Sequence, residues 1–237
     1  MTSSRPSLTP RQLALIEFTG IVLIGHLVKA ILDQLIWRYS GPIALALTLS
    51  VFVPYLRWRG ASLADLGLVA LTKRKQWLLL LPQTLLAFIL IPASGAGIAF
   101  AGESLGFAFM AGDPTGPQMR FGDLQGNTAL YLSWIPILWF AGPAEELYFR
   151  GIMIYQLGKG LGTSRVATAL TVFVPALVFG VGHLYYQGPR GLITTGVIGL
   201  TLGVLYLAYR RNLWPLMIAH AAFNTLTFTA MYKNWDV

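Results

Sequence analysis

Apolar residues run through most of this chain in long blocks, which short polar or Gly- and Pro-containing stretches separate. A helix that crosses the hydrocarbon core of a membrane needs roughly 20 mostly apolar residues. Segments that span should be helices, because an open strand would leave its backbone polar groups unsatisfied in lipid. The pattern predicts seven such helices, over residues 13–36, 41–56, 77–102, 129–157, 166–186, 191–209 and 213–232.

One further stretch, residues 61–72, is too short to span and mixes Asp65 with leucines between two basic clusters. This combination favours a helix that lies in the membrane interface. The expected fold is therefore all-α: a polytopic transmembrane bundle of about seven spans, with the interfacial helix as an eighth. Residues 1–237 should form a single integral membrane domain.

Composition supports a membrane protein. Of the 237 residues 55% are hydrophobic and only 11% are charged, which is too little polar surface for a soluble protein of this length. The absence of cysteine excludes disulfides, a thiol nucleophile and thiolate metal ligands. Glu17 interrupts the first apolar block, so we predict no cleavable signal peptide.

Lys and Arg exceed Asp and Glu by 17 to 9, but the basic residues form short clusters between the apolar blocks. This arrangement is typical of membrane topology and not of nucleic-acid binding, so the expected environment is the lipid bilayer of the cell membrane. The clusters place four segments in the cytoplasm: the N-terminus and residues 57–76, 150–165 and 210–212.

The longest loop, residues 103–127, should then be extracytoplasmic and mobile, and it contains Glu103, Asp113 and Asp123. Such a loop is either a connector or a gate for a substrate.

Titratable residues inside the expected spans need a reason, since a charged residue at a helix centre costs about 2.5–3.5 kcal/mol on insertion scales. In the first span, Lys29 and Asp33 are one helical turn apart and can neutralise each other. Glu17 lies near the cytoplasmic end and can extend toward water. His26 is interpreted as a packing histidine.

The fourth span contains "GPAEELYFRG". Gly142 and Pro143 can break or restart a helix, so the backbone just ahead of Glu145 should be irregular. Irregular backbone at membrane depth is tolerated only where protein or a watery cavity surrounds it.

The two glutamates of this span should behave differently. Glu146 and Arg150 are four residues apart and can form a charge pair in the interior. Glu145 points about 100° away around the helix and has no local partner. Burial and a like charge nearby make such a carboxylate hold a proton more readily, which suits a general base. The alternative is that Glu145 meets another helix and only holds the bundle together.

The fifth span contains "FGVGH", in which Phe179 and His183 are one turn apart and the glycines between them allow a close neighbour. The last span contains "HAAFN", in which His220 and Asn224 are four residues apart. Each pair alone is unspecific. Together they match peptide hydrolysis, in which Glu145 with His183 could activate water and the last span could supply oxyanion donors.

The three motifs "EELYFR", "FGVGH" and "HAAFN" resemble, in this order, those of the CAAX protease and bacteriocin-processing (Abi) family of intramembrane proteases. The resemblance covers residues 129–232 and implies an intramembrane endopeptidase. The implied roles are water activation for Glu145 with His183, oxyanion binding for His220 and Asn224, and support for Glu146, Arg150 and Phe179.

The resemblance leaves two catalytic types, a metalloprotease and a metal-independent glutamic protease. Glu145, His183 and His220 could bind zinc with one position open. The chain has no HExxH motif, and a metal-bound Glu145 would leave Glu146 as the only spare base. We therefore favour a site without metal or other cofactor.

Two other functions use the same residues. A proton-coupled transporter would also need Glu, His and Arg inside the bundle, but the two halves show no paired, interrupted segments. A noncatalytic immunity or binding protein would not need the complete motif set. The expected partner is a peptide or protein substrate at the membrane, and prenylated C-termini, bacteriocin leaders and sorting-signal tails all fit.

Depth is the difficulty for a shared site. Measured from the expected cytoplasmic helix ends, Glu145 lies about 18 Å deep, His183 about 27 Å and His220 about 10 Å. Convergence requires tilted helices, a helix break at a proline, or a later helix start.

Overall fold

The computed structural model describes residues 8–111 and 115–235, and every regular element within them is helical. A 3-10 turn, Trp37–Tyr39, joins the first two helices, another covers Ala108–Met110, and a π-helix, Leu147–Met153, joins α5 to α6. The α-helices are α1 (Pro10–Ile36), α2 (Ser40–Trp58), α3 (Arg74–Ser104), α4 (Thr115–Phe121), α5 (Thr128–Glu146), α6 (Ile154–Leu161), α7 (Arg165–Ala208) and α8 (Trp214–Lys233).

Among the described residues, three helical stretches are long and apolar enough to cross a membrane, namely Pro10–Trp58, Arg74–Ser104 and Arg165–Ala208. The first contains α1 and α2, which turn back on each other, and the last is kinked at Gly188, where φ is 63°. Each of these two stretches therefore contains two of the predicted segments. The all-α membrane class is confirmed, while the number of seven spans stays a prediction.

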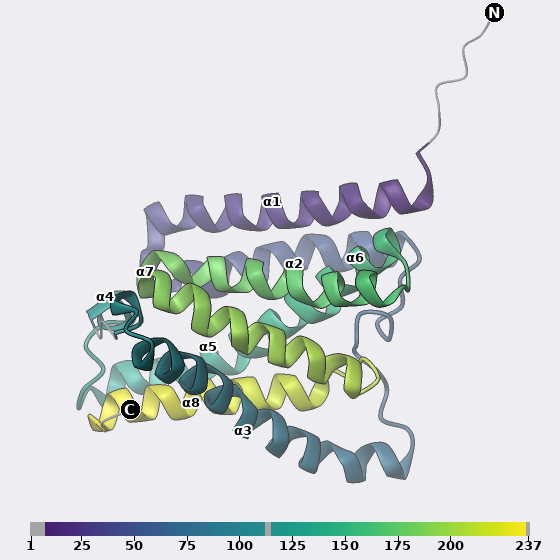
Figure 1. Cartoon of the computed structure of the whole chain (residues 1–237). Coiled ribbons are helices and arrows are strands. Elements are labelled where there is room, and N and C mark those ends of the chain that lie inside the picture. Colours follow the sequence, from purple (N-terminus) through teal and green to yellow (C-terminus); the bar gives the residue numbers. More distant parts are fainter. Residues whose placement is uncertain (1–7, 112–114, 236–237) are drawn as a thin grey trace, which may run out of the picture.

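The helices form a bundle in which α1 and α2 lie along one side and α8 lies on the other (Figure 1). Helix α5 packs along α8, α3 crosses α7 and α8, and α6 packs on α1 and α7. Two apolar clusters form most of the core, one around Leu202 and Leu216 and one around Ile21 and Ile152. The π-helix and α7 contribute apolar side chains to both clusters, Leu147 to each and Val172 and Val178 to one each, while α5 packs in a third cluster around Trp134.

The predicted interfacial helix over residues 61–72 is wrong, because this segment folds as turns. The Ser62 backbone N–H and hydroxyl donate to Asp65 Oδ2 at 2.8 and 2.7 Å, and the Asp65 N–H donates back at 3.0 Å. These bonds compete with a helix and hold the pKa of Asp65 below its ordinary value. Gly67, with φ of 86°, ends the turn, and Leu66 is buried, so the segment packs inward.

Glu17 does not extend to water as predicted. Its side chain is buried and accepts hydrogen bonds from Tyr55 Oη at 2.7 Å, Arg59 Nε at 2.9 Å and Gln156 Nε2 at 2.6 Å. Because these donors come from α2, the end of α2 and α6, Glu17 fastens α1 to two other helices. The spacing of residues within α1 could not predict these contacts, because the nearest partner, Tyr55, is 38 residues away along the chain.

The predicted pair of Lys29 and Asp33 is confirmed, and His26 is bound to the backbone of its own helix. Lys29 Nζ lies 2.7 Å from Asp33 Oδ2, and His26 Nδ1 lies 2.8 Å from the Val22 carbonyl oxygen. The loop 103–127, however, contains α4, whose Arg120 inserts into the bundle and is only 4% exposed. Asp113 of this loop lies outside the described residues, and the predicted mobility of the loop stays a prediction.

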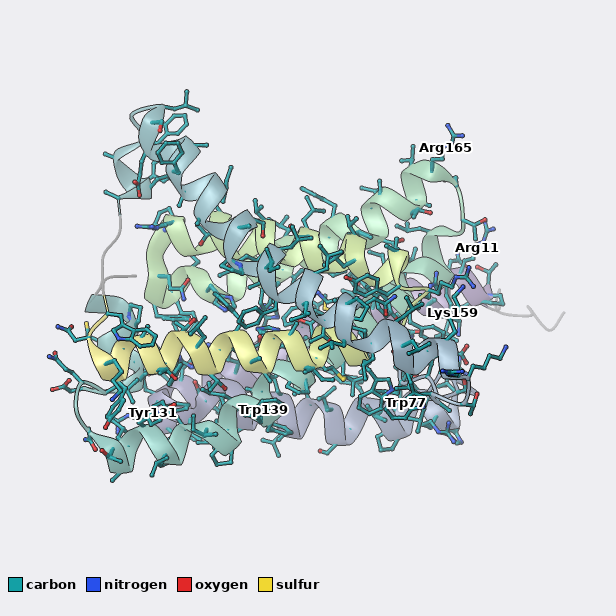
Figure 2. All side chains as sticks on the ribbon, turned by 90° about the horizontal axis from the view of Figure 1, so that it is seen from below. Arg11, Trp77, Tyr131, Trp139, Lys159 and Arg165 are labelled. Carbon is teal, nitrogen blue, oxygen red and sulfur yellow. The ribbon has the colours of Figure 1, made fainter. Side chains whose placement is uncertain are left out.

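Basic residues that the topology prediction places in the cytoplasm gather at one end of the bundle. Arg11, Lys159 and Arg165 lie together at that end, and Tyr131 lies toward the opposite end (Figure 2). The orientation of this end toward the cytoplasm stays a prediction.

Candidate active site

The two glutamates are the last residues of α5, and the π-helix Leu147–Met153 follows them directly. The predicted position of the irregular backbone, ahead of Glu145, is wrong, because α5 continues through Gly142 and Pro143. A π-turn widens the helix and occurs frequently at functional sites. Gly142 has another use: a Cβ there would lie 2.9 Å from the Ala221 nitrogen, so glycine lets α8 approach.

Glu146 is fully buried and connects three helical segments. Its Oε1 accepts from Arg150 Nη1 at 3.0 Å, which confirms the predicted pair, and from His220 Nδ1 at 2.7 Å. Arg150 is also buried, and its Nη2 donates to the Gly199 carbonyl oxygen at 3.2 Å. These hydrogen bonds offset part of the cost of burying the ion pair, and Glu146 Oε2 is left without a hydrogen-bond partner among the described residues.

His220 lies between both glutamates. Its Nδ1 contacts Glu146 Oε1, and its Nε2 lies 3.5 Å from Glu145 Oε2. A carboxylate oxygen accepts, so Nδ1 donates to Glu146 and Nε2 is the atom directed at Glu145. Glu145 thus has the partner that its own helix does not supply.

His183 is held in one tautomer by its own helix. Its Nδ1 lies 2.8 Å from the Phe179 carbonyl oxygen, which can only accept, so Nδ1 carries a proton and Nε2 of the neutral ring keeps its lone pair. The Phe179 ring packs edge-on against His183, with centroids 4.7 Å apart, and against His220, 6.3 Å apart. The Arg150 guanidinium lies 4.8 Å from the same ring, so Phe179 fixes the relative positions of these groups.

Glu145 and His183 line one hollow of about 90 Å³, which residues of α1, α2, the π-helix and α7 complete. The Glu145 side chain is 23% exposed, in contrast to buried Glu146. A hollow of this size with several polar groups in its lining can hold water. It also provides the surroundings that a carboxylate needs at membrane depth.

The structure brings three of the four predicted catalytic residues together. Glu145 and His183 share the hollow, and His220 contacts Glu145. Asn224 is half-buried one turn further along α8, and neither it nor His220 is among the described residues that line the hollow.

The level at which α8 begins explains why His220 lies beside Glu145. Helix α8 begins beside the π-helix, where the Leu213 N–H donates to the Gly67 carbonyl oxygen at 3.0 Å and Leu213 Cδ1 lies near Gly151. The chain of α5 and α6 continues beyond this level to Leu161. His220, near the start of α8, is therefore level with Glu145 although it is far from the end of the bundle.

Two residues that the sequence analysis treated as structural, His26 and Lys29, also line the hollow. His26 Nδ1 is bound to its own helix, as in His183, so its Nε2 is free of that bond. Their place in the hollow could have been predicted from the sequence. His26 and Lys29 are three residues apart, so they share one helix face, and the small residue Gly25 lies beside them.

The choice between a metal-dependent site and a site without metal stays a prediction. Within the described residues, no three His, Asp or Glu side chains are arranged to hold a metal ion.

The two glycines of "FGVGH" can be compared in a stability experiment, because only one of them, Gly180, is closely packed. A Cβ on Gly180 would collide with the Leu192 carbonyl oxygen, whereas a Cβ on Gly182 meets nothing within 4 Å. We expect Gly180→Ala to lower the free energy of unfolding by about 1–3 kcal/mol through overpacking. Gly182→Ala should raise it by about 0.5–1 kcal/mol, because alanine restricts the unfolded chain and favours the helix.

Unfolding of both variants in detergent micelles checks this prediction. Equal stabilities of the two variants would contradict the close contact between the arms of α7.

Comparison with known proteins gives a family match over the part of the chain that contains the motifs. Residues 127–226 match the family model described as Type II CAAX prenyl endopeptidase Rce1-like. This range contains every predicted site residue from Glu145 to Asn224. Neither a search of curated proteins nor a search of solved structures gave a match. The family match confirms the predicted resemblance to this endopeptidase family over that part of the chain.

Proposed function

We propose that this protein is an intramembrane endopeptidase in which Glu145 activates the attacking water. One observation supports the proposal most: Glu145 and His183 face the same hollow inside an apolar bundle, and His220 contacts Glu145 from a third helix. The match to a protease family over this part of the chain supports the reaction class.

The first step is attack by water. A water molecule in the hollow donates one hydrogen to the Glu145 carboxylate and the other to the free Nε2 of His183. Two acceptors fix the water's orientation and leave its oxygen lone pair directed at the substrate carbonyl carbon. As the bond between the water oxygen and the substrate carbonyl carbon forms, Glu145 takes a proton from the water. The π electrons of the substrate carbonyl move to the carbonyl oxygen.

The developing oxyanion needs a donor. His220 is the proposed first donor: when its ring is protonated, Nδ1 donates to Glu146, and Nε2, which lies 3.5 Å from Glu145 Oε2, can donate to an oxyanion that forms beside that carboxylate. Asn224, on the same helix, is the proposed second donor. Collapse of the tetrahedral intermediate breaks the C–N bond, and the proton held by Glu145 passes to the leaving amine, which gives a carboxylate and an amine.

The experiment uses the full chain in proteoliposomes with a library of membrane-inserted peptides. Wild type and His183→Ala are compared, each with and without a metal chelator, and products are identified by mass spectrometry. We expect wild type to cut a subset of peptides at the same rate with the chelator. His183→Ala should be slower by at least about tenfold, because one of the two water acceptors is lost.

Loss of wild-type cleavage on chelation, reversed by added zinc, would overturn the metal-free mechanism. A folded wild-type protein that cuts no peptide but moves protons or solutes across the vesicle membrane would overturn the proposed function itself.

A further inference from the structure

His26 of α1 brings to the hollow a hydrogen-bond acceptor that the proposed mechanism does not use. Its Nδ1 lies 2.8 Å from the Val22 carbonyl oxygen, so Nδ1 carries the proton and Nε2 of the neutral ring keeps its lone pair. The ring lines the hollow together with Glu145 and His183. Among the hydrogen bonds of the described residues, none includes His26 Nε2. This atom is therefore an unused acceptor beside the groups that activate water.

Three other polar side chains line the hollow, and each is directed to a partner of its own or away from α1. Lys29 can only donate, and its Nζ is bound to Asp33 at 2.7 Å. Tyr148 Oη donates to a backbone carbonyl oxygen of α1 at 2.8 Å. Thr48 turns its methyl group toward α1, because a Cβ on Gly25 would lie 3.7 Å from Thr48 Cγ2. The histidine of α1 is thus the acceptor that remains once the water-orienting pair is assigned.

The size of the hollow makes this acceptor important for binding. A volume of about 90 Å³ holds a few water molecules and not a peptide segment, so a substrate that enters displaces water from the lining. Displacement of a bound water loses affinity unless the incoming group reproduces its hydrogen bond. A peptide backbone carries N–H donors, which need acceptors inside an apolar bundle. The unused nitrogen and a substrate N–H therefore satisfy each other.

The wall that carries this acceptor is separate from the wall that carries the catalytic groups. His26 belongs to α1, which packs on α2 and α6, whereas Glu145 and His183 belong to α5 and α7. A substrate chain in the hollow contacts both walls. A hydrogen bond to α1 would then fix the distance of the chain from the carboxylate, and the position of the scissile carbonyl sets the rate.

We propose that His26 Nε2 accepts a hydrogen bond from a backbone N–H of the substrate next to the scissile bond and so positions the chain against Glu145. Because the bond is made to the main chain, it selects no side chain. It excludes proline at one position near the cut, since proline has no N–H. This inference rests on the proposed function and adds a requirement on the substrate's backbone.

The test uses a peptide that wild type cuts, with the scissile bond identified by mass spectrometry. In a series of analogues, one neighbouring peptide bond at a time is replaced by an ester, which removes the N–H and nearly keeps the shape. Wild type should cut one analogue with a kcat/KM at least about threefold lower than the parent peptide, the range for a neutral hydrogen bond. This comparison requires no variant of the protein.

Two replacements of His26 assign the effect to this residue. His26→Leu should lower kcat/KM for the parent peptide to about that of the sensitive analogue, and should change cleavage of the analogue little. His26→Gln should restore part of the discrimination, because its amide oxygen can accept a hydrogen bond. A packing role alone predicts that His26→Leu slows both peptides by the same factor.

Thr19→Val is the matched control on the same helix. Thr19 also binds the carbonyl oxygen four residues earlier, with Oγ1 donating to Leu15 at 2.9 Å, but it is exposed and lies outside the hollow. This variant should discriminate between parent and analogue as wild type does. Thermal unfolding of every variant in detergent shows that the compared proteins are folded.

Equal cleavage of the parent and of every ester analogue by wild type would overturn this inference and leave the endopeptidase standing. So would a discrimination that persists in folded His26→Leu, and its loss in Thr48→Val instead would assign the acceptor to Thr48. If folded wild type cuts no peptide at all, both this inference and the proposed function are wrong.

Discussion

Replacement of Glu145 by glutamine is expected to lower kcat for peptide cleavage by a factor of about 10²–10⁴, the usual contribution of a positioned general base. Glutamine has nearly the same shape but cannot take a proton from water. The side chain is 23% exposed toward the hollow and its closest charged neighbour is His220, so the fold should tolerate the change. Cleavage of one peptide by wild type and variant, together with thermal unfolding of both, checks this expectation.

A matched control is available in Glu103→Gln. Glu103 is half-exposed, pairs with Arg190 and lies outside the hollow, so its replacement should leave kcat unchanged. Wild-type activity in folded Glu145→Gln would remove this residue from the mechanism. The alternative in which Glu145 only holds helices together predicts a different result. Glu145→Gln would then lower the free energy of unfolding, and activity would fall only as far as the folded fraction falls.

Much of the candidate site was predictable because its signals are local. Glu146 and Arg150 are four residues apart, so helical geometry alone brings them together, and their contact is confirmed at 3.0 Å. The glycines between Phe179 and His183 indicated a close approach of backbone, which Gly180 makes with the second arm of α7. The alternation of apolar and polar blocks likewise predicted the helical class.

The features that were predicted wrongly from the sequence depend on contacts between distant parts of the chain. Glu17 is held by three donors from other segments, which no spacing within its own helix reveals. The level at which α8 begins is set by the bond between Leu213 and Gly67, and the turn over residues 61–72 makes that bond possible. The loop 103–127 looked like a connector, yet its Arg120 packs inside the bundle.

One local contact and one long-range contact meet at Glu146. Glu146 receives a hydrogen bond from Arg150 and another from His220, so one buried carboxylate sets the positions of both groups. With Nδ1 of His220 bound to Glu146, the other nitrogen must face Glu145. The second glutamate of the pair thus orients the histidine that contacts the first, and a change at Arg150 should affect stability and activity together.

Arg150→Met is expected to destabilise the protein by about 3–5 kcal/mol, because it leaves the fully buried Glu146 charge without its cation. The double variant Arg150→Met, Glu146→Gln should recover part of this loss, since the uncompensated charge is gone, although the hydrogen bond to Gly199 stays broken. Unfolding in mixed micelles measures all variants. Arg190→Met is the matched control, because its pair with Glu103 is half-exposed and such pairs contribute about 0–1 kcal/mol. A loss in Arg150→Met no larger than in this control, or no recovery in the double variant, would mean that the buried pair does not stabilise the site as its geometry implies.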